Sequence, residues 1–272
     1  MTAVAVLGYH SIGDAPRDGT LRWSVSPGDF DEQMALLRQR GCTPLTVSGY
    51  AELLRLGGPM PPKPVLVTFD DGFPDLATAA LPILRRYGIT ATAYVITSRV
   101  GAGTRPGKDP SLDWDQLADL RGNGVEIGSH SHTHRALDCL RRAELHEEVT
   151  ISKRVLEDGL RQRVHTFAYP YGYHSPAVRH TVRAAGYTSA CAVKNALSHP
   201  GDDPFAVARV LVERGTGAAG IDTILAGAGW PLAWPGERLR TRGWRAYRRA
   251  RHAWQHVVRR SARTPRTGGD AP

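Results

Sequence analysis

Cysteine is scarce in this sequence, and its scarcity excludes one class of protein. The 272 residues include three cysteines, Cys42, Cys139 and Cys191. Their number is odd, they lie far apart, and no two of them form a Cys-x-x-Cys pair. Small secreted domains that depend on disulfides need cysteines that can pair. We therefore expect no disulfide framework, and a reducing compartment fits the composition.

The sequence also lacks a long apolar run and a basic leader. No segment approaches the roughly 20 apolar residues that a helix needs to span a bilayer. The first ten residues, MTAVAVLGYH, carry no lysine or arginine and are typical of a buried strand rather than a secretory signal. We therefore expect a cytoplasmic protein.

Acidic residues are few in one region only, the C-terminal part of the chain. The net charge is +9, and much of the excess lies between Arg238 and Arg266. We expect residues 1–230 to form one barrel domain, and residues 231–272 to form an Arg/Trp-rich extension that is partly helical or disordered. The basic and aromatic residues of this extension are Arg245, Arg248, Arg249, Arg251, Arg259, Arg260, Trp244, Tyr247 and Trp254.

Three interpretations of this basic extension stay open. It could lie on an anionic membrane surface, at the inner face of the membrane. It could bind phosphates without sequence specificity, although nothing predicts a specific nucleic-acid partner. It could also be a solvated tail. The sequence does not predict the oligomeric state.

Apolar strands alternate with helical segments along most of the chain. Strands are expected near residues 3–7, 65–69, 90–96, 125–127, 164–169, 187–193 and 207–212. Helices are expected near residues 27–40, 51–56, 76–87, 114–120, 141–160 and 177–185, and residues 215–220 are expected to form a flexible joint. Repeated βα units imply a parallel sheet.

Ionisable and aromatic residues follow several of these strands, namely His10, Asp70, Asp71, His130 and Tyr171. In a β/α barrel the carboxyl ends of the strands converge on one face, where the active site lies. A doubly wound open sheet is the alternative, and it would spread the same residues along a line. Convergence favours an α/β fold with a distorted barrel of about seven strands.

Two adjacent carboxylates follow the second long strand, in Thr68-Phe69-Asp70-Asp71-Gly72. Neighbouring side chains at a strand end point in opposite directions. One carboxylate can therefore bind a metal while the other stays free as a base. The alternative is an Asp-Asp-Gly turn that caps the next helix.

Three histidines lie within five residues, in His130-Ser131-His132-Thr133-His134. His130 and His134 share a face if the segment turns helically, and His132 is an alternative ligand. Two histidines and one carboxylate leave positions open for water and substrate, as catalytic zinc sites do. Such a set favours zinc but also admits cobalt, nickel or manganese. The alternative is a group of surface histidines.

Six further residues could bind substrate or donate a proton. Tyr169, Pro170 and Tyr171 could form an apolar wall for a sugar or acyl group, or simply end a strand. Trp114 could stack on a sugar, or pack a helix against the barrel. His10 follows the first strand, whereas His199 lies in a loop.

Together, TFDDG, HSxxH and the aromatic-Pro-Tyr segment resemble the polysaccharide deacetylases of the NodB homology type, carbohydrate esterase family 4, over roughly residues 1–213. The resemblance implies a distorted (β/α)7 barrel that removes acetyl groups from N-acetylated sugars, with a water activated by the metal as nucleophile. It implies that Asp70 is the general base and that the backbone N–H of Tyr171 joins an oxyanion hole. It also implies the metal ligands Asp71, His130 and His134.

The chain departs from the family pattern in two places. Ala168 stands where the third motif usually has an arginine that orients the catalytic aspartate, and we expect Arg209 to supply the guanidinium instead. The usual late motif with the acid histidine is also missing. Gly8-Tyr9-His10 resembles the start of a permuted subgroup, in which a histidine after the first strand is the acid, so His10 is favoured over His199.

The leading prediction is a metal-dependent hydrolase that removes N-acetyl groups from an amino sugar in a polysaccharide, an oligosaccharide or a lipid-linked sugar. One alternative is a metal-dependent amidohydrolase acting on a non-sugar amide or imide. Another is a carbohydrate-binding relative that has lost catalysis, which the intact acidic and histidine motifs disfavour.

Overall fold

The computed structural model describes residues 3–14, 21–101, 110–234, 243–249 and 251 of the chain. Its strands are β1 (Ala5–Tyr9), β2 (Ser11–Ile12), β3 (Ser24–Val25), β4 (Thr43–Leu45), β5 (Pro64–Phe69), β6 (Ala91–Val95), β7 (Val125–Ser129), β8 (Thr166–Ala168), β9 (Ser189–Cys191) and β10 (Val210–Leu211). Its α-helices are α1 (Pro27–Gln39), α2 (Val47–Leu56), α3 (Leu81–Tyr87), α4 (Trp114–Gly122), α5 (Arg142–Leu160), α6 (Pro176–Ala184) and α7 (Ala218–Ala226). A π-helical turn, η2 (Leu76–Ala80), runs into α3, and short 3-10 turns form η1 (Leu21–Trp23), η3 (Leu137–Cys139) and η4 (Pro170–Gly172).

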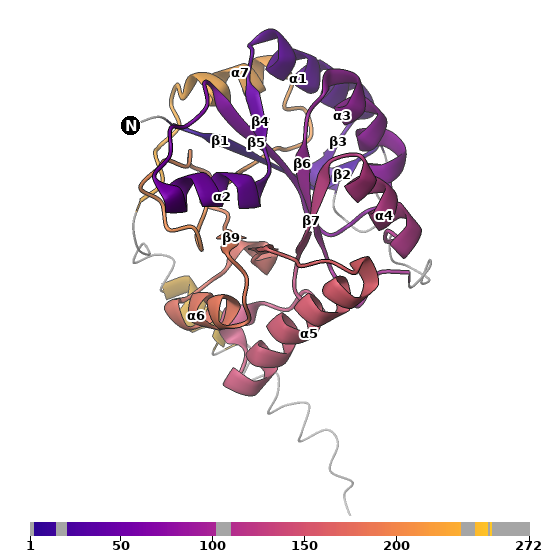
Figure 1. Ribbon diagram of the computed structural model, residues 1–272. Coiled ribbons are helices and arrows are strands. Elements are labelled where there is room, and N and C mark those ends of the chain that lie inside the picture. Colours follow the sequence, from indigo (N-terminus) through magenta and orange to yellow (C-terminus); the bar gives the residue numbers. More distant parts are fainter. Residues whose placement is uncertain (1–2, 15–20, 102–109, 235–242, 250, 252–272) are drawn as a thin grey trace, which may run out of the picture.

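Eight of these strands form one curled, parallel sheet surrounded by helices (Figure 1), and β2 and β3 form a separate two-stranded sheet. The order of the large sheet is β10-β1-β5-β6-β7-β8-β9, with β4 beside β5, and every pair is parallel. A bridge joins Cys191 of β9 to Val207, just before β10, and Val210 of β10 pairs with Leu7 of β1. Residues 207–211 therefore link the two ends of the sheet. This arrangement confirms the predicted distorted barrel and excludes the open doubly wound sheet.

The central strands are buried on both faces, which explains their nearly continuous apolar sequences. All six residues of β5 are buried, as are all five residues of β1 and of β6. Helices cover the outer face, and side chains from across the barrel cover the inner one. The burial on both faces is why these three strands could be predicted from composition alone.

Helix α2 closes the amino end of the barrel. The backbone N–H of Val47 donates to Thr92 Oγ1 at 3.0 Å, and that of Ser48 donates to Glu126 Oε2 at 3.2 Å. Thr92 and Glu126 lie near the beginnings of β6 and β7, and Tyr50 of α2 is fully buried. The amino end is therefore filled by apolar packing, and the carboxyl end is left for polar side chains.

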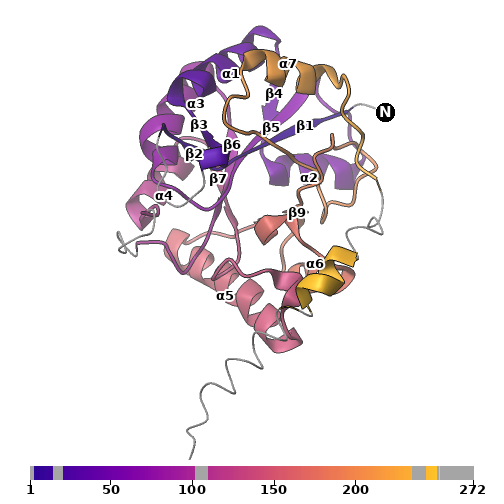
Figure 2. The same ribbon diagram turned by 180° about the vertical axis from the view of Figure 1, so that it is seen from behind.

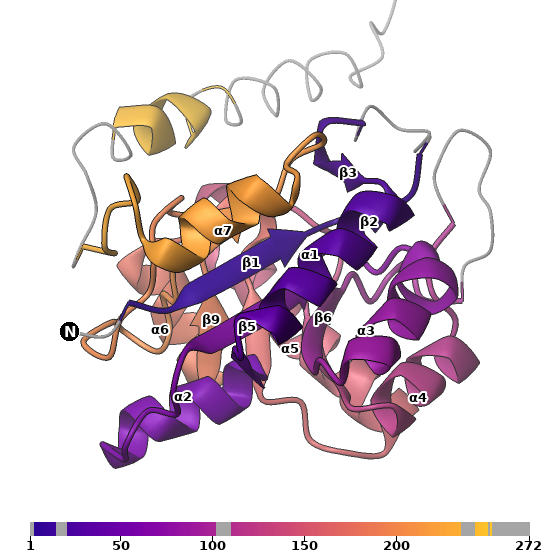
Figure 3. The same ribbon diagram turned by 90° about the horizontal axis from the view of Figure 1, so that it is seen from above.

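The structure corrects one feature of the predicted organisation. Residues 215–220 were expected to form a joint, but Gly220 belongs to α7, which lies beside α1 (Figure 3). Ile221 and Ile224 of α7 are buried. Burial of this apolar face against α1 outweighs the low helix propensity of the glycine. Glycines at the start of the segment concealed its apolar spacing.

The C-terminal extension is described only in part. Residues 243–249 and 251 are helical, whereas Trp254, Arg259 and Arg260 lie outside the described residues. Across the described ranges, no helix combines the length and the hydrophobicity that a membrane crossing requires.

Candidate active site

The carboxyl ends of four strands bring the predicted site residues together. The backbone N–H of Asp70, after β5, donates to the Tyr9 carbonyl at the end of β1 at 2.9 Å. The backbone N–H of His130, after β7, donates to the Val95 carbonyl of β6 at 2.9 Å. These backbone bonds continue the sheet ladder beyond the strands. They place His130 Nε2 at 3.9 Å from Asp70 Oδ2.

Asp70 forms a buried, bidentate ion pair with Arg209. The guanidinium Nη1 and Nη2 donate to Asp70 Oδ1 and Oδ2 at 2.6 and 2.7 Å. Asp70 is 4% exposed and Arg209 is 0% exposed. Arg209 Nη1 also donates to Thr68 Oγ1 at 3.2 Å. Two parallel hydrogen bonds fix the plane of the carboxylate. The guanidinium that orients Asp70 therefore comes from Arg209, in the segment that links the two ends of the sheet, and not from position 168, which is an alanine.

The pKa of Asp70 reflects two opposing effects. Burial raises the pKa, because the carboxylate is poorly solvated inside the protein. The Arg209 guanidinium, helped by His130, more than offsets burial and holds the pKa well below its ordinary value. Asp70 is therefore ionised at neutral pH, and its orientation is fixed before any substrate binds.

Asp71, His130 and His134 form a compact group of potential metal ligands. Within the described part of the chain, one ligand atom from each lies within 4.8 Å of the others. Asp71 Oδ1 lies 3.7 Å from His130 Nε2 and 3.3 Å from His134 Nε2. Burial, with His130 nearby, lowers the pKa of His134 to about 4. His134 is consequently a neutral imidazole at neutral pH, which is the form that binds metals.

These three residues fit a divalent cation. Asp71 Oδ1 is buried and accepts no hydrogen bond from any described residue, although an unsatisfied buried carboxylate oxygen is costly. His130 Nδ1–H donates to the Ala168 carbonyl at 2.8 Å, which leaves the Nε2 lone pair directed at the group. A carbonyl bonded to the second ring nitrogen is the usual support for a metal-binding histidine. One carboxylate and two imidazoles are also the donors of many catalytic zinc sites.

The loop that carries the histidines has a strained backbone and is held from α5. Ser131 and His134 have positive φ angles of 64° and 61°, which cost energy in residues other than glycine. The Glu148 carboxylate of α5 accepts the backbone N–H groups of His132 and Thr133 at 3.0 and 2.8 Å, and the Thr133 hydroxyl donates to the same carboxylate. Glu148 therefore stabilises the loop conformation that orients His134.

The structure separates the two candidate proton donors. His10 follows β1 at its carboxyl end, with its ring 5.7 Å from that of Trp23, and its Nδ1 is buried without a hydrogen bond to any described residue. Burial lowers the pKa of His10, and Asp70 and Asp71 oppose this effect. His199 follows Ser198, which pairs with Val4 at the other end of β1.

His199 is fully engaged by the backbone at that amino end. Its Nε2–H donates to the Ala233 carbonyl at 3.0 Å, and its Nδ1 accepts from the Gly201 N–H at 3.1 Å. Both ring nitrogens thus hold a loop together. The structure brings His10, but not His199, to the carboxyl end of the barrel.

The segment after β8 divides into a buried part and an exposed part. Tyr169 is 0% exposed, and its hydroxyl donates to the Phe205 carbonyl at 2.9 Å. Pro170 is also buried. Tyr171 is 57% exposed, and its ring lies 4.6 Å from that of His134. Of the three residues of this segment that were predicted to contact substrate, Tyr171 alone presents its side chain to solvent, whereas Tyr169 and Pro170 support it from the core.

Two further predicted candidates have partners away from the ligand group. A Cβ atom added to Gly159 of α5 would lie 2.2 Å from the Trp114 ring, so Trp114 packs α4 tightly against α5. This contact favours the helix-packing interpretation over sugar stacking. His132 Nδ1 bonds Thr97 Oγ1 at 2.9 Å, and His132 is absent from the group of potential ligands.

Glu148 and Trp23 were not identified from the sequence. A single glutamate on a long helix is typically solvated, and Trp23 lies in a short irregular segment. One signal for Glu148 was available, because it falls between Leu145 and Val149 on the buried side of α5. A charged residue at such a position usually has a partner.

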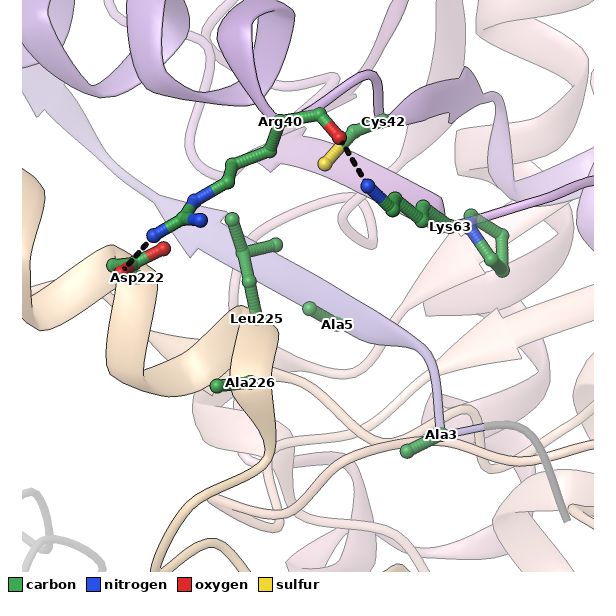
Figure 4. A pocket seen from close by; sticks show the side chains of 9 residues that line it. Ala3, Ala5, Arg40, Cys42, Lys63, Asp222, Leu225 and Ala226 are labelled. Atoms are coloured by element: carbon green, nitrogen blue, oxygen red, sulfur yellow. Dashed lines mark hydrogen bonds and ion pairs between the residues drawn. The ribbon is translucent and has the colours of Figure 1, made fainter.

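A cavity of about 420 Å³ lies elsewhere, at the amino ends of β1 and β5 (Figure 4). Lys63 donates from its Nζ to the Arg40 carbonyl at 2.7 Å at its rim, and Arg40 forms an ion pair with Asp222. None of the residues predicted to act in catalysis lines this cavity.

A curled parallel barrel with carboxylates and histidines at its carboxyl end defines a β/α-barrel enzyme. Residues 57–190 match the family described as polysaccharide deacetylase. This match, together with the relatives described next, supports the polysaccharide deacetylase family, the NodB or carbohydrate esterase family 4 proteins. Membership of the permuted subgroup stays a prediction.

Individual relatives support the same conclusion. The protein YxkH of Bacillus subtilis (strain 168) is 27% identical over 210 residues, which are 77% of this chain and 71% of that protein. The poly-beta-1,6-N-acetyl-D-glucosamine N-deacetylase of Staphylococcus aureus (strain MRSA252) is 25% identical over 199 residues, 70% of this chain and 68% of that one. The Streptococcus pyogenes deacetylase PplD, solved in complex with acetate, matches with a TM-score of 0.75 at 22% identity, over 82% of this chain and 98% of that chain. This last likeness shows the fold.

Proposed function

We propose that the chain is a metal-dependent hydrolase that removes acetyl groups from an N-acetylated amino sugar within a polysaccharide. The observation that carries the proposal is the ligand group Asp71, His130 and His134 beside the Asp70–Arg209 ion pair. The similarity to a Staphylococcus aureus protein whose name specifies an N-acetyl-D-glucosamine polymer supports a sugar substrate.

Asp70 would act as the general base. Asp71, His130 and His134 would hold a divalent cation, which we propose to be zinc and which would act as a Lewis acid on water and on the acyl carbonyl. Arg209 keeps Asp70 ionised and directs its carboxylate, so Asp70 is ready to take a proton. Because the same guanidinium lowers the pKa of Asp70, Asp70 is a weak base. To act as the general base, it would have to take its proton from a group that is more acidic than free water.

Two other groups would complete the reaction. The backbone N–H of Tyr171 would donate to the oxygen that becomes negatively charged when the carbonyl is attacked. Tyr171 has a positive φ of 59°, a conformation that costs energy in a residue other than glycine and is common at functional sites. His10 would donate a proton to the leaving amine, and its lowered pKa would make the protonated ring a stronger acid than an ordinary imidazolium.

Acetate release from N-acetylglucosamine oligomers tests the proposal. We expect the full-length protein to release acetate, and to expose one amine for each acetate, after zinc is added to chelated enzyme. We expect Asp70→Asn to lower the rate by about 100-fold or more, because one general base contributes about 10²–10⁴-fold. Asp115→Asn, at an exposed position on α4, is the matched control.

A panel of non-sugar N-acetyl amides distinguishes the alternative amidohydrolase. Release from these amides alone, with none from the sugars, would contradict the proposal.

The cytoplasmic location predicted from the sequence stays a prediction, as does contact of the basic extension with an anionic membrane.

A further inference from the structure

The partly described C-terminal extension contacts the barrel beside the segment that carries Tyr171. Its helix, residues 243–249, is the yellow ribbon of Figure 2. Arg248 Nη1 and Nη2 donate to Asp138 Oδ1 and Oδ2 at 3.0 and 2.7 Å, and Arg249 Nε donates to the Asp138 carbonyl at 2.7 Å. Asp138 is only 2% exposed. Bidentate pairing with a buried carboxylate fixes both the position and the rotation of the helix.

The same helix also contacts the aromatic segment directly. The Arg248 guanidinium lies 3.5 Å from the centroid of the Tyr173 ring, and Trp244 Nε1–H donates to the Tyr173 hydroxyl at 3.3 Å. Arg245 donates to the His174 carbonyl at 3.3 Å. The extension is therefore packed on residues 173–174, next to the exposed Tyr171.

A continuous row of aromatic rings results, which we call the aromatic row and which consists of Tyr171, Tyr173, Trp244 and Tyr247. The ring of Tyr171 lies 4.6 Å from that of His134 and 5.9 Å from that of Tyr173. Tyr173 contacts Trp244 through the hydrogen bond described above, and Trp244 stacks on Tyr247 at 5.2 Å with 24° between the planes. The row thus runs from a candidate metal ligand to the C-terminal helix.

The exposure of these rings is unusual for this protein. Tyr171, Trp244 and Tyr247 are 57%, 49% and 54% exposed. Among the large exposed apolar side chains of the described residues, these three are the aromatic ones. The other large exposed apolar side chains are leucines. Exposed aromatic groups gathered on one face indicate a binding surface rather than chance.

We propose that the aromatic row binds the sugar units that follow the acetylated unit in the candidate site, so that the substrate is an extended N-acetylated glycan. The inference rests on the proposed deacetylase function. A pyranose has C–H groups on one face and hydroxyls at its rim, so it stacks on an aromatic ring while its hydroxyls meet water or polar tips such as Tyr O–H and Trp N–H.

One feature favours a neutral glycan over an anionic surface as the occupant, and a second favours a long ligand. Arg245 and Arg248 share the Asp138 carboxylate, so their charges are engaged in the protein. The helix is also held rigidly against the barrel, which lowers the entropy lost when a long ligand binds. Contacts remote from the reacting bond can then contribute to catalysis on long substrates.

The test compares a dimer and a hexamer of N-acetylglucosamine with the full-length protein. We expect Trp244→Ala and Tyr247→Ala to lower kcat/KM for the hexamer about 3- to 10-fold more than for the dimer, because one aromatic stacking interaction contributes a factor of this size. The loss should come mainly from a higher KM. Trp244→Phe retains a ring and should restore most of the hexamer value. Leu56→Ala, at a 62% exposed position on α2 at the other end of the barrel, is the control and should change neither substrate.

A second variant separates the row from the residues that hold it. Asp138→Asn removes the charge that pairs with Arg248, so it should loosen the helix and reproduce the length-dependent loss. Calorimetric binding of both oligomers to chains that carry Asp70→Asn, with and without Trp244→Ala, gives a readout without turnover. Equal affinities for the hexamer in these two chains would overturn the inference, even if acetate release is normal. Tighter hexamer binding that depends on Trp244, without acetate release by the unaltered chain, would support the inference and overturn only the deacetylase proposal.

Discussion

At the scale of single residues, the position of Arg209 determines the state of the candidate base. Asp70 lies in a setting that would by itself favour the neutral carboxylic acid, because it is almost fully buried. Its charge persists because the two terminal guanidinium nitrogens of Arg209 donate to the two carboxylate oxygens. The two residues are 139 positions apart in the chain, so their pairing depends on the barrel bringing residues 207–211 beside β1.

Replacement of Arg209 by methionine should shift the pH dependence of activity. Without the guanidinium, burial is opposed mainly by His130, so the pKa of Asp70 rises and the base becomes protonated at a higher pH. An arginine neighbour lowers an aspartate pKa by about 1–3 units, so the acid limb of the kcat/KM profile should move upward by a similar amount. Loss of one partner of a buried pair should also cost about 3–5 kcal/mol of unfolding free energy.

A pH profile of kcat/KM distinguishes this role from a merely structural one. Arg55→Met, at an exposed arginine paired with Glu52 on α2, should leave both the profile and the stability nearly unchanged. An Arg209→Met protein with a uniform loss of rate at every pH, and no movement of the acid limb, would contradict the role given to Arg209.

At the scale of elements, the loop after β7 and helix α5 act together. The loop carries His134 in a left-handed conformation, and α5 supplies the Glu148 carboxylate that accepts two of its backbone N–H groups. A helix 19 residues long, packed along one face, is a rigid support for such a carboxylate. The geometry of the ligand group is thus set partly by a residue that has no contact with the cation site.

Replacement of Glu148 by glutamine should weaken metal binding more than it weakens the fold. Glutamine keeps the size and the helix propensity of glutamate, and its amide oxygen could still accept the two backbone N–H groups that share Oε2. It removes the negative charge, however, and hydrogen bonds to a charged acceptor are roughly twice as strong as neutral ones. Loss of a residue that supports a metal ligand typically costs about 10- to 100-fold in metal affinity. We expect a loss of that size in zinc affinity, measured by competition with a chromogenic chelator.

Glu147→Gln provides the matched control on the same helix. Glu147 is exposed, so its replacement should leave zinc affinity unchanged, and thermal unfolding of both variants should show a retained helix. Equal zinc affinity in the two variants would show that Glu148 does not position the ligands.

At the scale of the whole molecule, the predictable part of the fold was the part buried on both faces. β1, β5 and β6 are nearly continuous apolar runs, and their order with intervening helices indicated a parallel barrel. The short strands β2, β3 and β4 have two or three residues each, too few for any periodicity. Helix α7 was missed because its stability comes from packing on α1 rather than from its own composition.

The predictable part of the candidate site was the part that is local in sequence. Asp70 with Asp71, and His130 with His134, are close in the chain and follow strands, so their chemistry could be inferred without coordinates. One contact between distant elements, the Arg209–Asp70 pair, was indicated by the departure from the family pattern at Ala168, but the other distant contacts could not be derived in this way. The loop support from Glu148 and the packing of Trp114 on Gly159 depend on how α4 and α5 meet the barrel.

The dependence of deacetylation on bound metal is measured by a zinc titration of the chelated, full-length protein, with bound metal and acetate release determined in the same samples. We expect release from an N-acetylglucosamine oligomer to rise in proportion to bound zinc and to saturate at one ion per chain. We also expect Asp71→Asn to lower both the affinity for zinc and the release. Release that persists in the chelated protein, or zinc bound at Asp71, His130 and His134 without any release, would contradict the assignment of this site as a metal-dependent deacetylase.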